Sequence, residues 1–472
     1  KNLFEMAWEV GAVRPGVGVN DGVSMLIRRH TGLEPDWDYD HPLEKAALER
    51  TYGVPLYQDQ LMELAVHVGG FTQAEGDRMR RAFSRRNRAE LIPFWREKFM
   101  TGALARGVPP EAADKIFSKF HGEFQFPEAH AFAFGVTAYQ MSWMKRYYPL
   151  EFFVGLFNQQ PMGFYNLETL KEDARRHGVQ VLNPDANRSG KLSVIDDERL
   201  RLGFAHVTTV RSATADQVLA ERDSNGPFAS VSDFMARTGV RHESLDKLVD
   251  AGTFDSLVSR AVATSAPALV GVLEVPGPVP LPSSPDTNKV VREQRTVWTP
   301  LDENRRETKW EVGLRYRPVG RQLAFELPVE QDMVALPEAS EWDVMKGEYN
   351  TLGLYPRGHL MEKLRLHLPP DVVRSADIRH LKDGTPIRVA GVVIRRQRPL
   401  AKAVFITLED ETGHAPLVIW PDVYKRVRRT ARDAILLCSG IVSHREGTLN
   451  VVVRTVTPVP TDFSMLKSKD WG

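Results

Sequence analysis

The sequence predicts a multidomain α+β protein, in which a mainly helical region precedes a C-terminal five-stranded β-barrel. Two patterns predict this fold. Up to about residue 260, apolar residues recur at three- and four-residue spacing, as in LYQDQLMELAVHV and EAADKIFSKF, which is typical of amphipathic helices. Beyond about residue 372 the apolar spacing changes to two, which is typical of strands. A chain of 472 residues has room for roughly three or four domains.

We expect five segments along the chain. Residues 1–157 and 158–260 are mainly helical, and the helix TLKEDARR in the second of them ends before a glycine. Residues 261–300 are rich in Pro, Gly and Ser and are expected to form a linker. Residues 301–371 mix helical and irregular stretches, and residues 372–465 form the barrel.

Charge and cysteine content limit the classes of protein. The sequence has 62 Lys+Arg and 61 Asp+Glu, a net charge of +1, so any basic surface for nucleic acid must be local. The single cysteine, Cys438, cannot form an internal disulfide, and no Cys/His grouping has zinc-ligand spacing, so a reducing compartment is expected. No apolar run approaches the roughly 18 residues of a membrane span, so no membrane partner is expected. Because the chain begins with Lys1 in a helix-like stretch, it is expected to be part of a longer protein.

The C-terminal strands have the order of an OB-fold. The predicted strands are TPIRVAGVVIRR, AVFITLED, APLVIW, AILLCSGIVS and TLNVVVRTVTPV, with the helical DVYKRVRRTARD between the third and fourth. In an OB-fold the first and last hairpin loops commonly flank single-stranded nucleic acid. The basic residues of the first loop are Arg395, Arg396, Arg398 and Lys402, and the aromatic residues that could stack on bases are Phe405, Trp420 and Tyr424. The alternative is that these aromatic residues belong to the barrel core.

The stretch DRMRRAFSRRNR, Asp77 to Arg88, is unusually basic. It holds six arginines after one aspartate. On a helix, Arg78, Arg81, Arg85 and Arg88 would form one stripe beside a buried stripe of Met79, Ala82 and Phe83. Like charges at this spacing cost about 0.2–0.5 kcal/mol per pair, which an arriving triphosphate or DNA backbone would offset. The alternative is a solvated helix whose arginines pair with acids elsewhere in the fold.

Longer motifs in a fixed order carry a resemblance to a known family. AVRPGVG, YGVPLYQDQLMELA, GGFTQAEGDRMRRAF, FPEAHAFAF and YQMSWMKRYYP resemble the fingers of bacterial C-family DNA polymerases, the family of the DNA polymerase III α subunit. NQQPMGFY, LPVEQDMV and FITLEDETG are similar to its error-prone, damage-induced branch. The resemblance covers nearly the whole chain. It implies polymerase fingers, a helix-hairpin-helix region and an OB-fold, acting in DNA replication, repair and translesion synthesis in the bacterial cytoplasm.

The resemblance also implies roles for single residues. For the incoming dNTP they are Arg80 and Arg81 of the MRRA motif, His130 and Arg14, and for DNA they are Arg85, Arg86, Lys145 and Arg146. Two positions depart from the family pattern, Val17 in place of a proline and Ala129 in place of a serine. In HVTTVRSATADQV, which aligns with the helix-hairpin-helix, Thr209 and Arg211 replace glycines. The hairpin is therefore expected to be strained or remodelled, and Arg211 could offset part of the lost phosphate binding.

The catalytic carboxylates of the family have no match in the sequence. Polymerisation needs two metal ions held by carboxylates, which the family carries on palm strands that precede the fingers. Mg²⁺ is therefore expected to be held by palm residues outside this chain. Asp36, Asp38 and Asp40 alternate in PDWDYDHP, but the flanking prolines favour a loop, so no metal site is expected. Glu409 to Glu411 are expected to be turn residues between barrel strands.

The sequence therefore predicts the C-terminal part of an error-prone DNA polymerase, which binds dNTPs, template-primer DNA and single-stranded DNA and is inactive alone. The chief alternative is a non-catalytic DNA-binding or scaffolding protein derived from a polymerase, and a weaker one is a single-strand-binding module without a nucleotide pocket. The sliding clamp and other translesion-synthesis proteins are candidate partners. The clamp-binding candidates are Gln322, Leu323, Phe325 and Leu327, whose alternating apolar side chains suit an extended peptide. The alternative for this segment is a strand edge packed on the chain's own surface.

Overall fold

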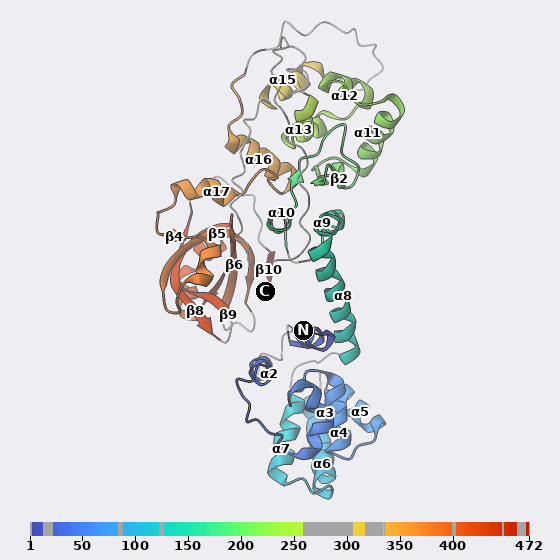
Figure 1. The fold of residues 1–472 in the computed structure, drawn as a ribbon, viewed down its shortest axis with the longest axis vertical. Helices are drawn as coiled ribbons and strands as arrows, with labels where there is room; N and C mark the ends of the chain where they lie inside the picture. Colours follow the sequence, from blue (N-terminus) through green and yellow to red (C-terminus); the bar gives the residue numbers. More distant parts are fainter. Residues whose placement is uncertain are drawn as a thin grey trace, which may run out of the picture. The chain divides into compact units, whose positions relative to one another are not determined.

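The computed structural model describes residues 2–12, 22–83, 88–121, 127–163, 165–257, 305–316, 334, 336–398, 403–445, 448–459 and 469–471. The predicted linker 261–300 and the predicted clamp segment lie outside these ranges. The chain divides into two compact units, Lys1–Tyr148 and Pro149–Gly472, and each is described by itself (Figure 1). The first unit thus ends at Tyr148, whereas the sequence pattern suggested a boundary at residue 157. In the described part of the chain, no helix combines the length and apolar character needed to cross a bilayer.

The first unit is helical. Its α-helices are α1 (Leu3–Ala12), α2 (Gly22–His30), α3 (Lys45–Leu48), α4 (Gln58–His67), α5 (Gln73–Phe83), α6 (Arg88–Ala105), α7 (Pro110–Ser118) and α8 (Glu128–Tyr147). Helices α4 to α7 surround a core that contains Phe99 and Phe117, whose ring centroids are 5.5 Å apart. The start of α4 is fixed by Gln60, whose side-chain oxygen accepts hydrogen bonds from the backbone N–H groups of Leu56 and Tyr57. Helix α8 packs against α1.

The second unit begins with a helical region. Its elements are α9 (Pro149–Asn158), α10 (Leu167–Arg176), β1 (Val181–Leu182), β2 (Val194–Asp196), β3 (Arg199–Arg201), α11 (Ser212–Asn225), α12 (Val231–Thr238), α13 (His242–Asp250) and α15 (Arg305–Arg315). Phe153, Phe204, Phe234 and Phe254 lie in their common core. The connecting region to the barrel contains α16 (Glu341–Leu352) and α17 (Leu360–Leu364). Residues of α16 and α17 pack against barrel residues such as Ala390 and Ile435.

The second unit ends in a closed five-stranded barrel, which confirms the predicted fold class. The strands are β5 (Pro386–Gln397), β6 (Val404–Asp410), β7 (Gly413–Ile419), β8 (Ile435–Arg445) and β9 (Thr448–Pro458). They pair in the order β5-β6-β7-β9-β8, and pairing between β5 and β8 closes the barrel. Helix α18 (Pro421–Val427) lies between the third and fourth strands, as the OB-fold requires. Two short strands, β4 (Val372–Val373) and β10 (Lys469–Trp471), pair with β5 in parallel.

Helix α10 departs from the pattern expected of a charged helix. Its sequence, LETLKEDARR, is strongly polar, and it ends near Gly178, which has a φ of 79°, as predicted. Its polar residues Glu168, Thr169, Lys171 and Glu172 are nevertheless buried. This burial means that the charged face of α10 contacts the rest of the second unit rather than water.

Candidate nucleic-acid interface

Two exposed aromatic side chains mark the outer face of the barrel. Phe405 on β6 lies opposite Gln397 of β5 and Val418 of β7, and Arg395 lies opposite Thr407. Directly paired residues share a face of the sheet, as do residues two apart on one strand, so Arg395 and Phe405 lie on the same face. Phe405 is 39% exposed and Trp420, which follows β7, is 49% exposed. The interpretation of these two residues as barrel core is therefore wrong.

The predicted basic residues of the first loop differ in their surroundings. The Arg398 guanidinium lies 5.3 Å from the ring centroid of Tyr424, which packs against the barrel core. Arg396 donates hydrogen bonds to the carbonyl oxygens of Ala431 (2.8 Å) and Asp433 (2.7 Å), so it fastens the segment before β8. Lys402 lies outside the described residues. Arg395 therefore shares the face of Phe405, and Arg398 lies over the ring of Tyr424.

The arginines of α5 pair with an acid of their own helix. Arg80 donates to Asp77 Oδ1 through Nε (3.0 Å) and Nη2 (2.8 Å), and Arg81 donates to Asp77 Oδ2 through Nε (2.8 Å). Hydrogen bonds from Arg81 and Arg80 lower the pKa of Asp77. Arg80 also contacts Gln58, whereas the side chain of Arg81 is 64% exposed. Met79 and Ala82 are buried, as the helical pattern predicted. Arg80 and Arg81 therefore pair with Asp77, the first residue of the same stretch.

Helix α8 carries three of the predicted site residues and an aromatic cluster that sequence reasoning missed. His130 is exposed and lies near Phe134, and Lys145 and Arg146 lie in the last turn. On either side of these two basic residues, Trp143, Tyr147 and Tyr148 expose 44–63% of their surface. The ring centroid of Trp143 lies 5.2 Å from that of Tyr147 and 5.4 Å from that of Tyr148. From Ala129 to Leu150 the sequence contains no acid. The aromatic residues on both sides of Lys145 and Arg146 in SWMKRYY are the sequence signal that could have indicated this cluster.

The predicted strain in the hairpin is confirmed. The short helix Phe204–His206 leads into a turn at Thr209, whose φ of 74° is unusual for a β-branched residue. Among the described residues, the buried hydroxyl oxygen of Thr209 has no hydrogen-bond partner. Arg211 is the N-cap of α11 and is exposed. The chain therefore keeps the tight turn without the glycine that normally allows it.

The structure also locates the aspartates that were considered for metal binding. Asp36, Asp38 and Asp40 lie in a segment without helix or strand, and Asp40 Oδ2 is 2.9 Å from Lys119 Nζ. Within the described ranges, no group of three His, Cys, Asp or Glu side chains could hold a metal ion. Several other predicted site residues lie outside those ranges, namely Arg14, Arg85, Arg86, Gln322, Leu323, Phe325 and Leu327.

Comparison with known families assigns three domains along the chain. Residues 1–107 match the bacterial DNA polymerase III alpha subunit finger domain, residues 178–263 a helix-hairpin-helix motif and residues 387–459 an OB-fold nucleic acid binding domain. Together, these matches show that the chain is similar to proteins of the bacterial DNA polymerase III alpha-subunit family, and the predicted resemblance is confirmed.

Within this family, similar relatives are error-prone DNA polymerases. The enzyme of Anaeromyxobacter dehalogenans (strain 2CP-C) is 34% identical over 98% of this chain and 38% of its own length. The enzyme of Nocardia farcinica (strain IFM 10152) is 33% identical over 96% of this chain and 37% of its own length. The chain thus spans little more than a third of these curated relatives. Among solved structures, asparaginyl-tRNA synthetase from Pyrococcus horikoshii shares 23% identity over 19% of this chain and 23% of its own, with a TM-score of 0.18.

The strained turn gives a testable prediction about stability. Replacing Thr209 by glycine removes the side chain from an unfavourable φ and removes a buried unpaired hydroxyl, although glycine makes the unfolded chain more flexible. We expect Thr209→Gly to raise the free energy of unfolding by about 1 kcal/mol, measured by urea denaturation. The control is Thr208→Gly, which removes the hydroxyl that donates to the Thr351 carbonyl oxygen (2.7 Å). That variant should be destabilised, and a Thr209→Gly variant that is also destabilised would contradict the assignment of strain.

Proposed function

We propose that this chain is the DNA- and nucleotide-handling part of an error-prone DNA polymerase that acts in repair and translesion synthesis. The observation that carries the proposal is the outer face of the barrel, where Phe405 and Trp420 are exposed, Arg395 shares the face of Phe405, and Arg398 lies over Tyr424. Single-stranded nucleic acid is bound through base stacking on aromatic rings and through cationic contacts to phosphate, and this face offers both. The finger-domain match of residues 1–107 and the error-prone relatives support the same function.

The first unit supports the nucleotide part of the proposal. Arg80 and Arg81 already hold a carboxylate, Asp77, in a forked arrangement, and a phosphate group presents the same kind of acceptor to guanidinium donors. Lys145 and Arg146 lie beside exposed aromatic rings, which suits contact with a DNA strand. We propose that Arg80 and Arg81 bind the triphosphate of the incoming nucleotide and that the end of α8 contacts DNA. His130 is proposed to lie near the nucleotide.

The chief alternative is a non-catalytic DNA-binding or scaffolding protein. That alternative shares the barrel face but gives no reason for a paired-arginine site in the first unit. Nucleotide binding and primer extension distinguish the polymerase from this non-catalytic alternative. We also propose binding to the sliding clamp and Mg²⁺ held by a separate palm, and both of these proposals apply only to the polymerase. The relatives extend well beyond the part matched by this chain, which leaves room in them for such a palm.

The barrel face predicts the properties of single-strand binding. With the whole chain and a fluorescent oligothymidine, affinity should fall as salt rises, with a log–log slope of about −0.7 for each phosphate neutralised. Trp420→Ala should weaken binding by about 1–3 kcal/mol, because a stacked ring is lost. The control is Trp310→Ala, since Trp310 is similarly exposed (43%) but lies on α15. Equal effects of the two substitutions, or binding without salt dependence, would contradict the proposed face.

The arginine pair predicts a selective effect on nucleotide affinity. Replacing both Arg80 and Arg81 by alanine should weaken binding of a labelled dNTP to the chain by more than about tenfold, because charge-assisted hydrogen bonds are lost. Arg78→Ala is the matched control, since Arg78 is exposed on the same helix. Its affinity should change less than about threefold, as expected for loss of a screened surface charge. The assignment is wrong if the double variant retains full affinity.

The missing carboxylates predict that the chain alone does not catalyse polymerisation. Holding a triphosphate by charge does not stabilise the transition state, which requires two metal ions about 3.5–4 Å apart on fixed carboxylates. We therefore expect no primer extension by the purified chain with Mg²⁺ or Mn²⁺, and extension when a palm-containing fragment of a relative is added. Extension by the chain alone that disappears in Asp36→Ala or Asp38→Ala would identify those residues as the active site. Extension in neither reaction would favour the non-catalytic alternative.

A further inference from the structure

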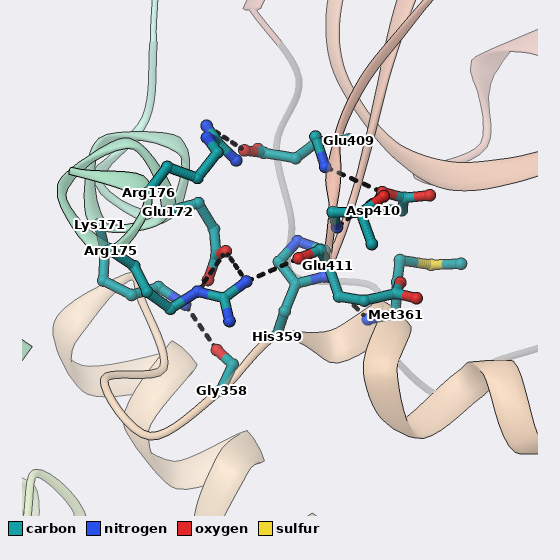
Figure 2. A network of polar contacts seen from close by, with 12 residues as sticks. Lys171, Glu172, Arg175, Arg176, Gly358, His359, Met361, Glu409, Asp410 and Glu411 are labelled. Carbon is teal, nitrogen blue, oxygen red and sulfur yellow. Dashed lines mark hydrogen bonds and ion pairs between the residues drawn. The ribbon is translucent and has the colours of Figure 1, made fainter. Parts of the chain in front are cut away.

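Helix α10 joins the helical region to the barrel through its charged face. Figure 2 shows Lys171, Glu172 and Arg175 projecting from this helix toward two different segments. On one side lies the connecting region around Gly358 and His359, and on the other lies the end of β6 with Glu409, Asp410 and Glu411. The opposite face of α10 contributes Leu170 and Ala174 to the core of the helical region. One short helix therefore contacts all three parts of the second unit.

The contacts with the connecting region are buried and charged. Lys171 Nζ lies 2.9 Å from Glu168 Oε1 and 2.5 Å from both Glu172 Oε1 and the Gly358 carbonyl oxygen. Glu168 also accepts hydrogen bonds from the Tyr349 hydroxyl (2.8 Å) and the Tyr355 backbone N–H (2.9 Å). Burial alone would raise the pKa of Glu172, but Lys171, His359 and Arg175 lower it to about 2. The lysine therefore holds a charged partner in the interior.

The contacts with the barrel involve the residues that the sequence suggested were only turn residues. Glu409 is 1% exposed, and its Oε2 accepts a 2.6 Å hydrogen bond from the Thr169 hydroxyl. Arg175 Nη2 donates to the backbone oxygen of Glu411 at 2.6 Å and also contacts Glu172. That expectation is wrong for Glu409 and Asp410, which end strand β6 and are buried. Glu409 is thus a contact of α10 rather than a turn residue.

The same acidic segment is fixed from the connecting region. Arg365 donates to Asp410 Oδ2 (3.2 Å) and pairs with Glu411. Asp410 also accepts hydrogen bonds from the Ser375 backbone N–H (2.8 Å) and from Thr412. The end of β6 is consequently held by side chains from two separate segments, 169–175 and 365–375, rather than by its own hairpin alone.

An interface of this kind favours orientation more than stability. Removing charges from water is costly, and a buried ion pair often stabilises a fold no more than well-packed apolar residues of similar volume. Hydrogen bonds to charged groups are, however, directional, and they are lost when the groups move apart by an ångström or two. We infer that the polar face of α10 selects one relative arrangement of the barrel and the helical region.

We propose that α10 is a latch that holds the barrel in a fixed orientation, so that the barrel face and the hairpin at Thr209–Arg211 bind one nucleic-acid molecule together. Thr169, Arg175 and Glu409 are positioning residues in this proposal, because they act on the nucleic-acid face through the placement of the barrel. The inference rests on the proposed function for its ligand. The latch itself is a property of the protein and can be measured without DNA.

The first measurement is the distance between the two parts. Spin labels are attached to Ser224→Cys on α11 and Arg454→Cys on β9, both exposed positions. The native Cys438 does not interfere, because it is buried and burial raises its pKa to about 12. We expect one narrow distance distribution in the otherwise unchanged protein and a distribution at least twice as broad in Thr169→Val/Arg175→Met. The control is Lys382→Met, which removes one positive charge from an exposed position just before β5.

Folding and fixed orientation are separated by a milder variant. The Arg175 side chain is 46% exposed, so Arg175→Met alone is compatible with a folded protein if the double variant does not fold. Circular dichroism should show that the single variant retains its fold. The spin-label distance distribution of the same variant should be broadened. A distribution as narrow as that of the unsubstituted protein in folded variants would overturn the latch.

The second measurement tests joint binding. An oligothymidine of about 6 nucleotides suits a single OB-fold, whereas one of about 25 extends past it. With the latch intact, the longer strand should bind at least tenfold more tightly than the shorter one. Once the barrel has bound it, the effective concentration of the strand at the second site, the hairpin at Thr209–Arg211, is raised. The latch variants should lose that advantage and keep the affinity for the short strand within twofold. If the long strand has no advantage in the unsubstituted protein, joint binding is wrong while single-strand binding by the barrel stands. If neither strand binds, the proposed function fails, and the distances still decide whether the latch exists.

Discussion

The proposed nucleic-acid face depends on one irregularity in the hydrogen bonding between β5 and β6. Val393 pairs with Leu408, but the next pair is Arg395 with Thr407, so Ile394 is an extra residue on β5. Without it, strict alternation would place Arg395 opposite the inward-facing Ile406. The bulge reverses the direction of the following side chains and brings Arg395 to the face of Phe405. Nearby, a Cβ at Gly391 would lie 2.7 Å from the Glu409 carbonyl oxygen, so the two strands can approach closely there only with glycine.

Much of the fold could be predicted because it follows from local periodicity. The period-two segments found all five barrel strands to within about two residues, and the helix between the third and fourth strands identified the topology. The bulge could not be predicted, since one extra residue leaves the apolar pattern of β5 almost unchanged. The exposure of Phe405 and Trp420 could not be predicted either, because an aromatic residue on a barrel strand suits either the core or a binding face. The pairing register decides between them.

The charged residues were harder to assign than the apolar ones, for a physical reason. An apolar side chain has one favourable environment, whereas an arginine or glutamate is satisfied by water, by a ligand or by a buried partner far away in sequence. Asp77 and Arg80 are close enough in sequence to have been paired by helical spacing, as i and i+3. Thr169 and Glu409 are separated by 240 positions, and nothing in either local sequence indicates the hydrogen bond between them. The buried face of α10 was therefore visible only in three dimensions.

The pairing of Asp77 with Arg80 and Arg81 affects how an anion would bind to these arginines in the first unit. The two guanidinium groups are already neutralised in part by a carboxylate of the same helix, so a phosphate that uses the same donors would replace that carboxylate. Such an exchange releases a carboxylate to solvent instead of bulk counterions. Binding through these arginines would then respond weakly to ionic strength, in contrast to the barrel, where contacts with successive phosphates displace ions from the strand. If both proposed sites operate, moderate salt would therefore weaken DNA binding by the barrel more than nucleotide binding by Arg80 and Arg81.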